Sequence, residues 1–313
     1  MARQNLVMLK GSVIKVDIRE KKDGTMEAVL VMGVIRGYRN IGDGREKVKI
    51  DQPIIITRNP ELVSEIAQWH RNDIGVIKGV VSTRIVIKSH VCPNPDCRQK
   101  DVQEGLLVYI EPIYAEKVCT LSSTDECIKY LGQIREISNM AYIVGNLTRD
   151  PKKVKVKNGP TVTQYPIAIN RKYNIRQDPA TTKADFPWVK SYGQNAENDR
   201  DRLKMGSLVL IDGFLQSRSI NRKCICSKCQ GKYEWMDRAV EIVPYETEYL
   251  ANVYTIEEAE QNRLRRREQR MHDLGLDKFM MARPENKDID YDSDIITDED
   301  KAAGMDDFVE DDE

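Results

Sequence analysis

The chain has 313 residues, of which 40% are hydrophobic and 32% charged, enough for two or three domains with cores of their own. No apolar run approaches the length of a membrane-spanning helix, and the N-terminus carries no secretory signal. We therefore expect a soluble, cytoplasmic protein that spans no membrane. Seven cysteines, an odd number, in a chain without an export signal argue against a disulfide framework.

The net charge of −1 conceals a sharp division along the chain. Residues 284–313 hold 14 acidic residues and two lysines, a net charge of −12, which leaves +11 for residues 1–283. A basic body with an acidic tail is typical of proteins whose partner is a polyanion. A solvated surface with a solubilising tail would show the same pattern, so charge alone does not identify the partner.

Two stretches of the chain match each other at a constant offset of 134 residues. A run of matches at one offset indicates duplication of a whole domain. We therefore expect two related domains, at 1–118 and 139–250, with a linker at 119–138. The matched pairs are Asn5 and Asn139, Gly11 and Gly145, Asp51 and Asp185, Pro53 and Pro187, Gly79 and Gly213, Arg84 and Arg218, and Cys92 and Cys226.

Each half has the pattern of a small β domain with one helix. The predicted elements are strands at 27–35 and 161–170, each behind a hairpin turn dipeptide (Asp23-Gly24 and Asn158-Gly159), and helices at 60–71 and 194–204. A further strand follows each helix. One helix among about five strands describes the OB-fold, a small Greek-key barrel, so we predict a mainly β chain of two tandem OB-folds. SH3-like barrels and sandwiches fit the pattern as well.

Five of the cysteines cluster at matching places in the two halves. Cysteines two to four residues apart on a turn can both bind one zinc ion, so each cluster is a candidate for zinc binding. Free thiols in a reducing cytosol are the alternative. The candidate ligands are His90, Cys92 and Cys97 in the first half and Cys224, Cys226 and Cys229 in the second.

Two arrangements of the metal remain open. In one, the two halves share a single zinc ion through Cys92, Cys97, Cys226 and Cys229. In the other, each half binds its own ion, using His90 or Cys224 and a distant fourth ligand such as Cys119 or Cys127. The role would be structural in both cases, because four protein ligands leave no open position for chemistry.

A charged segment at 251–283 follows the second domain. A helix is predicted at 255–272, because Thr255 and Glu258 form a capping box, and arginines crowd its second half. This helix could contact nucleic acid or another subunit, although a solvated helix is the commoner case. Residues 284–313 are acidic and poor in aromatic side chains, and we expect them to be disordered.

The second half resembles the bacterial single-stranded DNA-binding protein family. The resemblance lies in IVGNLTRDP at 143–151, YPIAINRKY at 165–173, DFPWVKSYGQNAEN at 185–198 and LKMGSLVLIDGFLQSRS at 203–219, in the family's order. The resemblance implies an OB-fold that binds single-stranded DNA. It extends to the first half mainly through the internal repeat.

In this family, bases stack on aromatic side chains and cations follow the phosphates. Every base has a π-face, so such platforms bind with little regard to sequence, and the cations make affinity depend on salt. Trp188 lies two residues beyond Phe186, so strand alternation places both on one face. Tyr165, in an apolar strand, fits the core as well as the platform. The candidates are Tyr165, Tyr173, Phe186, Trp188 and Tyr192 for stacking, and Arg149, Arg171, Lys172, Lys190 and Arg218 for phosphates.

The first half departs from the family's aromatic pattern. At the same offset, Ile54 stands in place of Trp188 and Arg58 in place of Tyr192. We expect the barrel to be retained and its strand-binding face altered. This half would then serve assembly or a weaker second site.

The predicted function is sequence-independent binding of single-stranded DNA in replication, recombination or repair, without enzymatic activity. Family members assemble four OB-folds, which implies a homodimer of this chain. The family's acidic tail recruits replication and repair proteins through an apolar tip, whereas this chain ends in acidic residues at 310–313. The alternatives are a protein-interaction adaptor and a single-stranded RNA binder, because stacking does not distinguish RNA from DNA.

Overall fold

The computed structural model of this chain describes residues 4–37, 48–154, 160–170 and 184–273. The predicted tail, and with it Arg171, Lys172 and Tyr173 among the candidate site residues, lies outside the described residues. No helix in the described part combines the length and apolar character needed to cross a membrane.

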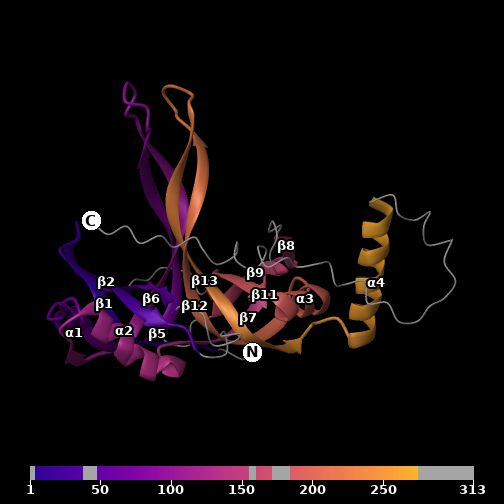
Figure 1. The fold of residues 1–313 in the computed structure, drawn as a ribbon, viewed down its shortest axis with the longest axis horizontal. Coiled ribbons are helices and arrows are strands. Elements are labelled where there is room, and N and C mark those ends of the chain that lie inside the picture. The colour runs from indigo at the N-terminus through magenta and orange to yellow at the C-terminus, as the bar shows by residue number, and fades with distance from the viewer. Residues whose placement is uncertain (1–3, 38–47, 155–159, 171–183, 274–313) are drawn as a thin grey trace.

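The first half closes into a five-stranded barrel (Figure 1). Its closure follows from the pairing of β1 with both β2 and β5, while β6 pairs with β5 and β4, and β4 with β2. The short β3 pairs antiparallel with the end of β2. The elements are β1 (Asn5–Glu20), β2 (Met26–Ile35), β3 (Ile50–Asp51), β4 (Ile54–Thr57), α1 (Pro60–Ile66), β5 (Asp73–Val91) and β6 (Lys100–Thr120).

The second half repeats this arrangement. Here β7 pairs with β9 and β12, β13 with β12 and β11, and β11 with β9, which closes a second barrel. The predicted fold class, two OB-fold barrels in a mainly β chain, is confirmed. The elements are β7 (Asn139–Leu147), β8 (Lys152–Val154), β9 (Val162–Asn170), β10 (Ala184–Asp185), β11 (Trp188–Tyr192), α3 (Gly193–Arg202), β12 (Leu208–Ile225), β13 (Lys232–Ala251) and α4 (Ile256–Asp273).

The segment between the barrels folds as α2 (Thr124–Gln133) and the short 3₁₀ helix η2 (Arg135–Ile137). Ser123 caps α2, since its side chain accepts a hydrogen bond from the backbone N–H of Glu126. Cys127 and Leu131 are buried against the first barrel. The chain therefore passes between the barrels along a packed helix.

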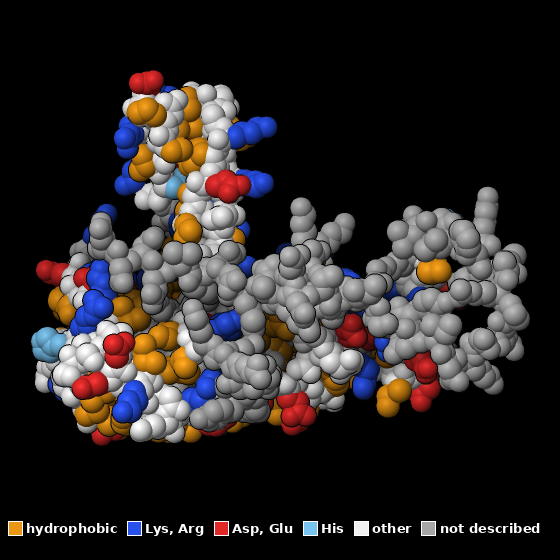
Figure 2. All heavy atoms as spheres, viewed as in Figure 1, with side chains coloured by type: hydrophobic (Ala, Val, Ile, Leu, Met, Phe, Trp, Pro, Cys, Tyr) orange, Lys and Arg blue, Asp and Glu red, His pale blue; other side chains and the backbone are white. Residues whose placement is uncertain are grey.

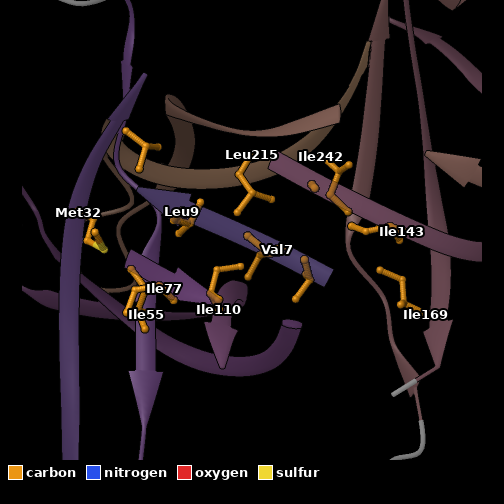
Figure 3. Packing of buried hydrophobic residues seen from close by; sticks show 14 of the residues in the cluster. Val7, Leu9, Met32, Ile55, Ile77, Ile110, Ile143, Ile169, Leu215 and Ile242 are labelled. Carbon is orange, nitrogen blue, oxygen red and sulfur yellow. The ribbon is translucent and has the colours of Figure 1, made fainter. Parts of the chain in front are cut away.

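The two barrels join edge to edge through β1 and β7, which pair antiparallel. The register places Val7 opposite Ala141, its counterpart at the offset of 134 residues. A local two-fold axis therefore passes through this pair, and one 13-stranded sheet runs through the described residues of both barrels. A single apolar cluster spans the junction, from Leu9 on β1 to Ile143 on β7 (Figure 3).

Two glycines of the repeat are required by close backbone approach. A Cβ on Gly79 would lie 2.6 Å from the carbonyl oxygen of Glu111, and one on Gly213 would lie 2.2 Å from that of Val243. Both glycines sit where the register of the hairpin shifts. The neighbour in each case is backbone, which cannot rotate away, so only glycine fits at this bulge.

Beyond the barrels, β5 and β6 continue as one long hairpin and β12 and β13 as another. We call the parts at residues 84–107 and 218–239 hairpin 1 and hairpin 2, and the pair the tower (Figure 1). Asp237 of hairpin 2 is buried between Lys88 of hairpin 1 and Arg222, which lies 3.2 Å away. The two hairpins thus pack against each other through their inner faces.

The C-terminal helix α4 begins at the predicted capping box. The Glu258 backbone N–H donates to Thr255 Oγ1 at 3.1 Å, and the Thr255 N–H donates to the Glu258 carboxylate at 2.8 Å. Arg266 of α4 pairs with Asp201 on α3, which attaches the helix to the second barrel. The predicted helix is confirmed.

Candidate nucleic-acid interface and metal centre

The aromatic candidates lie on β11 and the residues just before it. Phe186 is 45% exposed, and Trp188 and Tyr192 are half-buried. Val189 and Ser191, at the alternate positions of the strand, are fully buried. The strand thus presents aromatic rings outward from the barrel and packs its other face into the core.

The first barrel holds this aromatic segment in place. The Asp185 carboxylate accepts a hydrogen bond from the backbone N–H of Thr83 at 2.7 Å, and the Phe186 N–H donates to Thr83 Oγ1 at 3.2 Å. This contact between the barrels was not predicted from the sequence. The feature of the sequence that could have indicated this contact is the match between Asp185 and Asp51 in the internal repeat.

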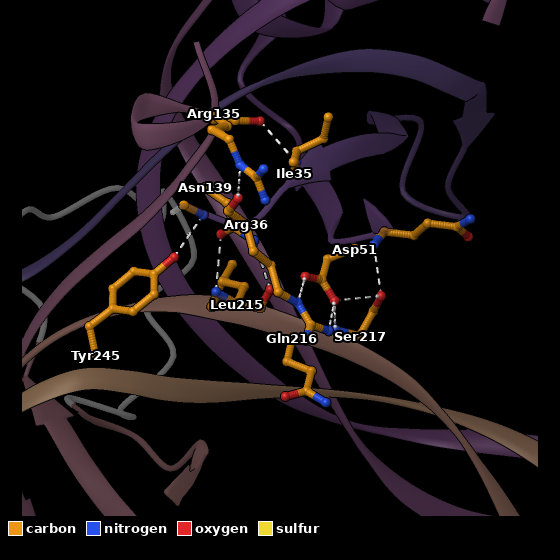
Figure 4. A network of polar contacts seen from close by, with 12 residues as sticks. Ile35, Arg36, Asp51, Arg135, Asn139, Leu215, Gln216, Ser217 and Tyr245 are labelled. Atoms are coloured by element: carbon orange, nitrogen blue, oxygen red, sulfur yellow. Dashed lines mark hydrogen bonds and ion pairs between the residues drawn. The ribbon is translucent and has the colours of Figure 1, made fainter. Parts of the chain in front are cut away.

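Asp51 makes the equivalent contact in the opposite direction. Its carboxylate accepts from the backbone N–H of Ser217 at 2.8 Å, and it also binds the Arg36 guanidinium at 2.7 and 3.0 Å (Figure 4). Arg36 lies over the Phe214 ring, 5.2 Å from its centre. Each barrel therefore inserts one buried aspartate into the base of the other barrel's hairpin.

The structure corrects the prediction for Tyr165. Its side chain is fully buried, and its hydroxyl donates to Asp199 at 2.9 Å. Tyr249 donates to the same carboxylate at 2.9 Å. Burial raises the pKa of Tyr165 well above its ordinary value. Strand β9 packs this side of the barrel with apolar side chains on its inner face, and Tyr165 belongs to that core. It cannot stack with bases.

The cationic candidates differ in how accessible their charged groups are to a phosphate. Arg149 is exposed, whereas Arg218 forms two 2.9 Å contacts with Glu241 and remains partly exposed. The Lys190 side chain is only 10% exposed and faces the same Glu241 at 3.9 Å, and burial lowers its pKa. The prediction of a phosphate contact is therefore corrected for Lys190, while Arg149 and Arg218 remain candidates.

On the equivalent face of the first barrel, a buried carboxylate neutralises the charge of the nearby cations. Glu27 pairs with Arg58 at 3.2 Å, with Arg84 at 3.4 Å and with Lys21. Burial opposes ionisation of Glu27, but the hydrogen bonds from Lys21 and Arg58 hold its pKa below the ordinary value. Ile54 occupies the place of Trp188. In the described part of this face, the places of Trp188 and Tyr192 thus hold no aromatic ring, and the arginines Arg58 and Arg84 are paired with Glu27.

The tip of the tower brings four cysteines together. Cys92 Sγ lies 3.7 Å from Cys229 Sγ, and Cys97 Sγ lies 3.6 Å from Cys226 Sγ. All four sulfur atoms lie within 4.8 Å of one another. Tetrahedral zinc with Zn–S bonds of about 2.3 Å requires sulfurs about 3.8 Å apart, which these distances match.

Both cysteine turns end on a residue in the left-handed region. Arg98 follows Cys97 with φ of 47°, and Gln230 follows Cys229 with φ of 58°. The thiols influence one another: hydrogen bonds from the Gly231 backbone and the Cys226 thiol lower the pKa of Cys229 to about 7, whereas burial and the neighbouring thiols, acting against backbone hydrogen bonds, raise the pKa of Cys92 and of Cys97. The two turns therefore present their sulfurs in the same way, one from each half.

His90 and Cys224 lie outside this cluster, next to it between the two hairpins. The His90 ring stacks on Trp235 at 4.7 Å, and its Nδ1 is 2.6 Å from the Tyr233 hydroxyl. Cys224 Sγ is 4.0 Å from His90 Nδ1. The group of cysteines close enough to hold one ion therefore contains Cys92, Cys97, Cys226 and Cys229, without His90 or Cys224. Cys127 is buried in α2, far along the chain from it, with its thiol directed at the Asn72 carbonyl.

Comparison with known proteins shows which family the second half is similar to. Residues 138–234 match the model of the Single-strand binding protein family. Single-stranded DNA-binding protein 2 of Staphylococcus aureus is 38% identical over 85 residues, which is 27% of this chain and 60% of that protein. The single-stranded DNA-binding protein of Halalkalibacterium halodurans is 38% identical over 81 residues, 26% of this chain and 47% of that protein.

One solved structure resembles both halves together. The single-stranded DNA-binding protein from Thermus aquaticus aligns over 81% of this chain and 97% of its own, with a TM-score of 0.51 and 16% identity. At that identity the likeness concerns the fold alone. The chain matches at most about 60% of the length of the curated relatives given above. The resemblance of the second half to bacterial single-stranded DNA-binding proteins is thus confirmed.

Proposed function

We propose that this protein binds single-stranded DNA without regard to sequence, through the outward face of the β10–β11 segment of its second barrel. The observation that carries the proposal is the exposed Phe186 beside Trp188, on a segment that Asp185 fastens to the first barrel. A rigid aromatic edge loses little entropy when a base stacks on it, and each stacked base contributes about 1–3 kcal/mol. Such binding would protect single strands in replication, recombination or repair.

Arg149 and Arg218 supply the cationic part of the interface. Arg149 is exposed next to the barrel face, and Arg218 shares Glu241 with Lys190. Contacts of these side chains with phosphates release condensed counterions, so the affinity falls as salt rises. The relatives described above are named as binding proteins, and we propose that this chain is likewise a binding protein and not an enzyme.

A titration with labelled oligo-dT, oligo-rU and duplex DNA at two salt concentrations tests this function. We expect tight, salt-dependent binding of oligo-dT and much weaker binding of the duplex, whose bases are already stacked. Equal affinity for duplex and oligo-dT would contradict the proposal. Tighter binding of oligo-rU would assign the interface to RNA, and no binding of any strand would favour a protein-interaction adaptor.

We further propose that the four-cysteine cluster holds one structural zinc ion per chain. The donor set is four thiolates at tetrahedral spacing, which suits zinc, and it is closed, so no position is open for catalysis. Bound there, the ion would hold the tips of the two hairpins together. Elemental analysis of protein purified without added metal should return about one zinc per chain.

We propose that two chains assemble, since the resemblance implies four OB-folds per functional unit and each chain supplies two. Replication or repair proteins would be recruited through the acidic segment at 284–313, whose charge follows the family's pattern. Binding of such proteins should weaken on removal of this segment. We place the protein in the cytosol, where single-stranded DNA and reduced thiols occur together.

A further inference from the structure

The outward face of hairpin 1, turned away from hairpin 2, is apolar and exposed. Its residues form four successive pairs across β5 and β6, and its apolar side chains are 39 to 74% exposed. Apolar side chains gather along the tower, with Lys and Arg at its sides (Figure 2). The pairs are Ile85 with Leu106, Ile87 with Glu104, Ser89 with Val102, and Val91 with Lys100.

Hairpin 2 shows that the fold does not require this apolar face. The equivalent pairs there are Ser219 with Arg238, Asn221 with Met236, Lys223 with Glu234, and Ile225 with Lys232. Polar side chains thus replace most of the apolar ones, although both hairpins hold the same cysteine turns. An exposed apolar patch that the fold does not need marks an interaction surface.

We propose that this face of hairpin 1 binds the same face of a second copy of the chain. A two-fold axis along the pair Ser89–Val102 would stack the two faces with their strands antiparallel. Val102 would then meet Val102 of the second copy, and Ile87 would meet Val91. A two-fold contact uses one surface on both copies and therefore requires a self-complementary surface, which these rows provide.

The charges on the face obey the same symmetry. Glu104 and Lys100 lie at equal distances on either side of Val102 along β6, so the axis brings each of them opposite the other in the second copy. In the described part of the chain, neither side chain has an ion pair of its own. The same operation on hairpin 2 would place Met236 against Lys232, which is not complementary.

The face is small compared with the roughly 800 Å² per partner of a standard stable interface. It should therefore associate weakly in free solution and strongly between copies held next to each other on one strand, where their effective concentration is high. This second statement rests on the proposed DNA binding. Hairpin 1 would then make binding to a long strand cooperative.

Crosslinking with a zero-length carbodiimide tests the contact directly. Lys100 and Glu104 are about 13 Å apart along their own strand, too far for a direct amide bond within one chain. A mixture of ¹⁵N-labelled and unlabelled protein should give a Lys100–Glu104 crosslink between the two isotopic forms, at high protein concentration and on long oligo-dT. Absence of this crosslink in both conditions overturns the proposal.

Charge variants separate this contact from DNA binding. Lys100→Glu and Glu104→Lys should each lower cooperativity on long oligo-dT about tenfold, because like charges then face each other twice. The double variant should restore it. Affinity for an oligo-dT that holds one protein should stay at the parent value in all three, whereas a phosphate contact would make Glu104→Lys bind more tightly.

Lys232→Glu is the matched control, with the same change of charge on hairpin 2. Its cooperativity should equal that of the parent. Equal cooperativity of Lys100→Glu and parent, or failure of the double variant to recover, overturns the contact. If the parent protein itself does not bind the short oligo-dT, the proposed function is overturned instead.

Discussion

Asp185 and Thr83 face each other across the boundary between the two barrels, with the carboxylate 2.7 Å from the Thr83 backbone nitrogen. The same contact recurs between Asp51 and the backbone of Ser217, 134 residues away in each partner. The local two-fold axis at Val7 and Ala141 therefore relates the interlocks between the barrels as well as the barrels themselves. The residue that follows Asp185 is the aromatic Phe186, whereas the residue that follows Asp51 is Gln52.

Single substitutions of the two aspartates should have similar effects on stability and different effects on DNA binding. Asp185→Ala leaves the Thr83 N–H without its acceptor and should lower the free energy of unfolding by about 1–3 kcal/mol. It should also weaken oligo-dT binding, because Phe186 loses its anchor. Asp51→Ala should destabilise at least as much, since Arg36 is left unpaired, yet bind oligo-dT nearly as the parent does. Urea unfolding and fluorescence titration measure the two quantities, and equal loss of affinity in both variants would contradict this assignment.

A single zinc ion shared by the four cysteines, as proposed above, predicts an all-or-none loss of metal. Cys92→Ser and Cys226→Ser should each abolish zinc binding completely, because each removes one of four ligands to the same ion. Cys224→Ser, which lies outside the cluster, is the control and should retain the metal. Loss of half of the zinc in each of the first two variants would show separate sites.

The bulge glycines predict a large and local cost. Gly213→Ala should destabilise the protein by about 1–3 kcal/mol or more, because its Cβ would meet the Val243 carbonyl at 2.2 Å. Gly132→Ala in α2 is the control, with no neighbour within 4 Å, and should stabilise by up to about 1 kcal/mol. Thermal unfolding of both variants checks the difference in sign. A neutral Gly213→Ala would contradict the close approach.

The acidic segment should compete with DNA. Its net charge of −12 is tethered to a body of +11, which gives it a high effective concentration at any basic surface. A chain that ends at Arg283 should bind oligo-dT more tightly than the parent at low salt, and the gain should shrink as salt rises. Equal affinities at low salt would show that the segment does not reach the interface.

Much of this architecture could be predicted from the sequence, because the constant offset identifies a duplicated domain whatever its structure. The hairpin turns and the alternating apolar residues then indicate strands, and the cysteine spacing indicates a metal. The burial of Tyr165 could not be decided from the sequence, because its alternation with Ile167 and Ile169 favours the core, whereas its match to an aromatic position of the family favours the binding face. The exclusion of His90 and Cys224 depends on the stacking of two hairpins distant in sequence. Their spacing to the other cysteines contains no such information.

The central claim is that the second barrel supplies the stacking platform, and Trp188 is its most direct probe. Of the three tryptophans, Trp69 is buried and bound to Glu65, and Trp235 stacks on His90 in the tower. Quenching of tryptophan fluorescence by oligo-dT should therefore come from Trp188 and disappear in Trp188→Phe. Trp188→Ala should weaken binding by about 1–3 kcal/mol, whereas Ile54→Ala, at the equivalent place in the first barrel, should change it little. Binding of Trp188→Ala at the parent's affinity, together with loss of binding in Ile54→Ala, would show that the roles of the two barrels are reversed.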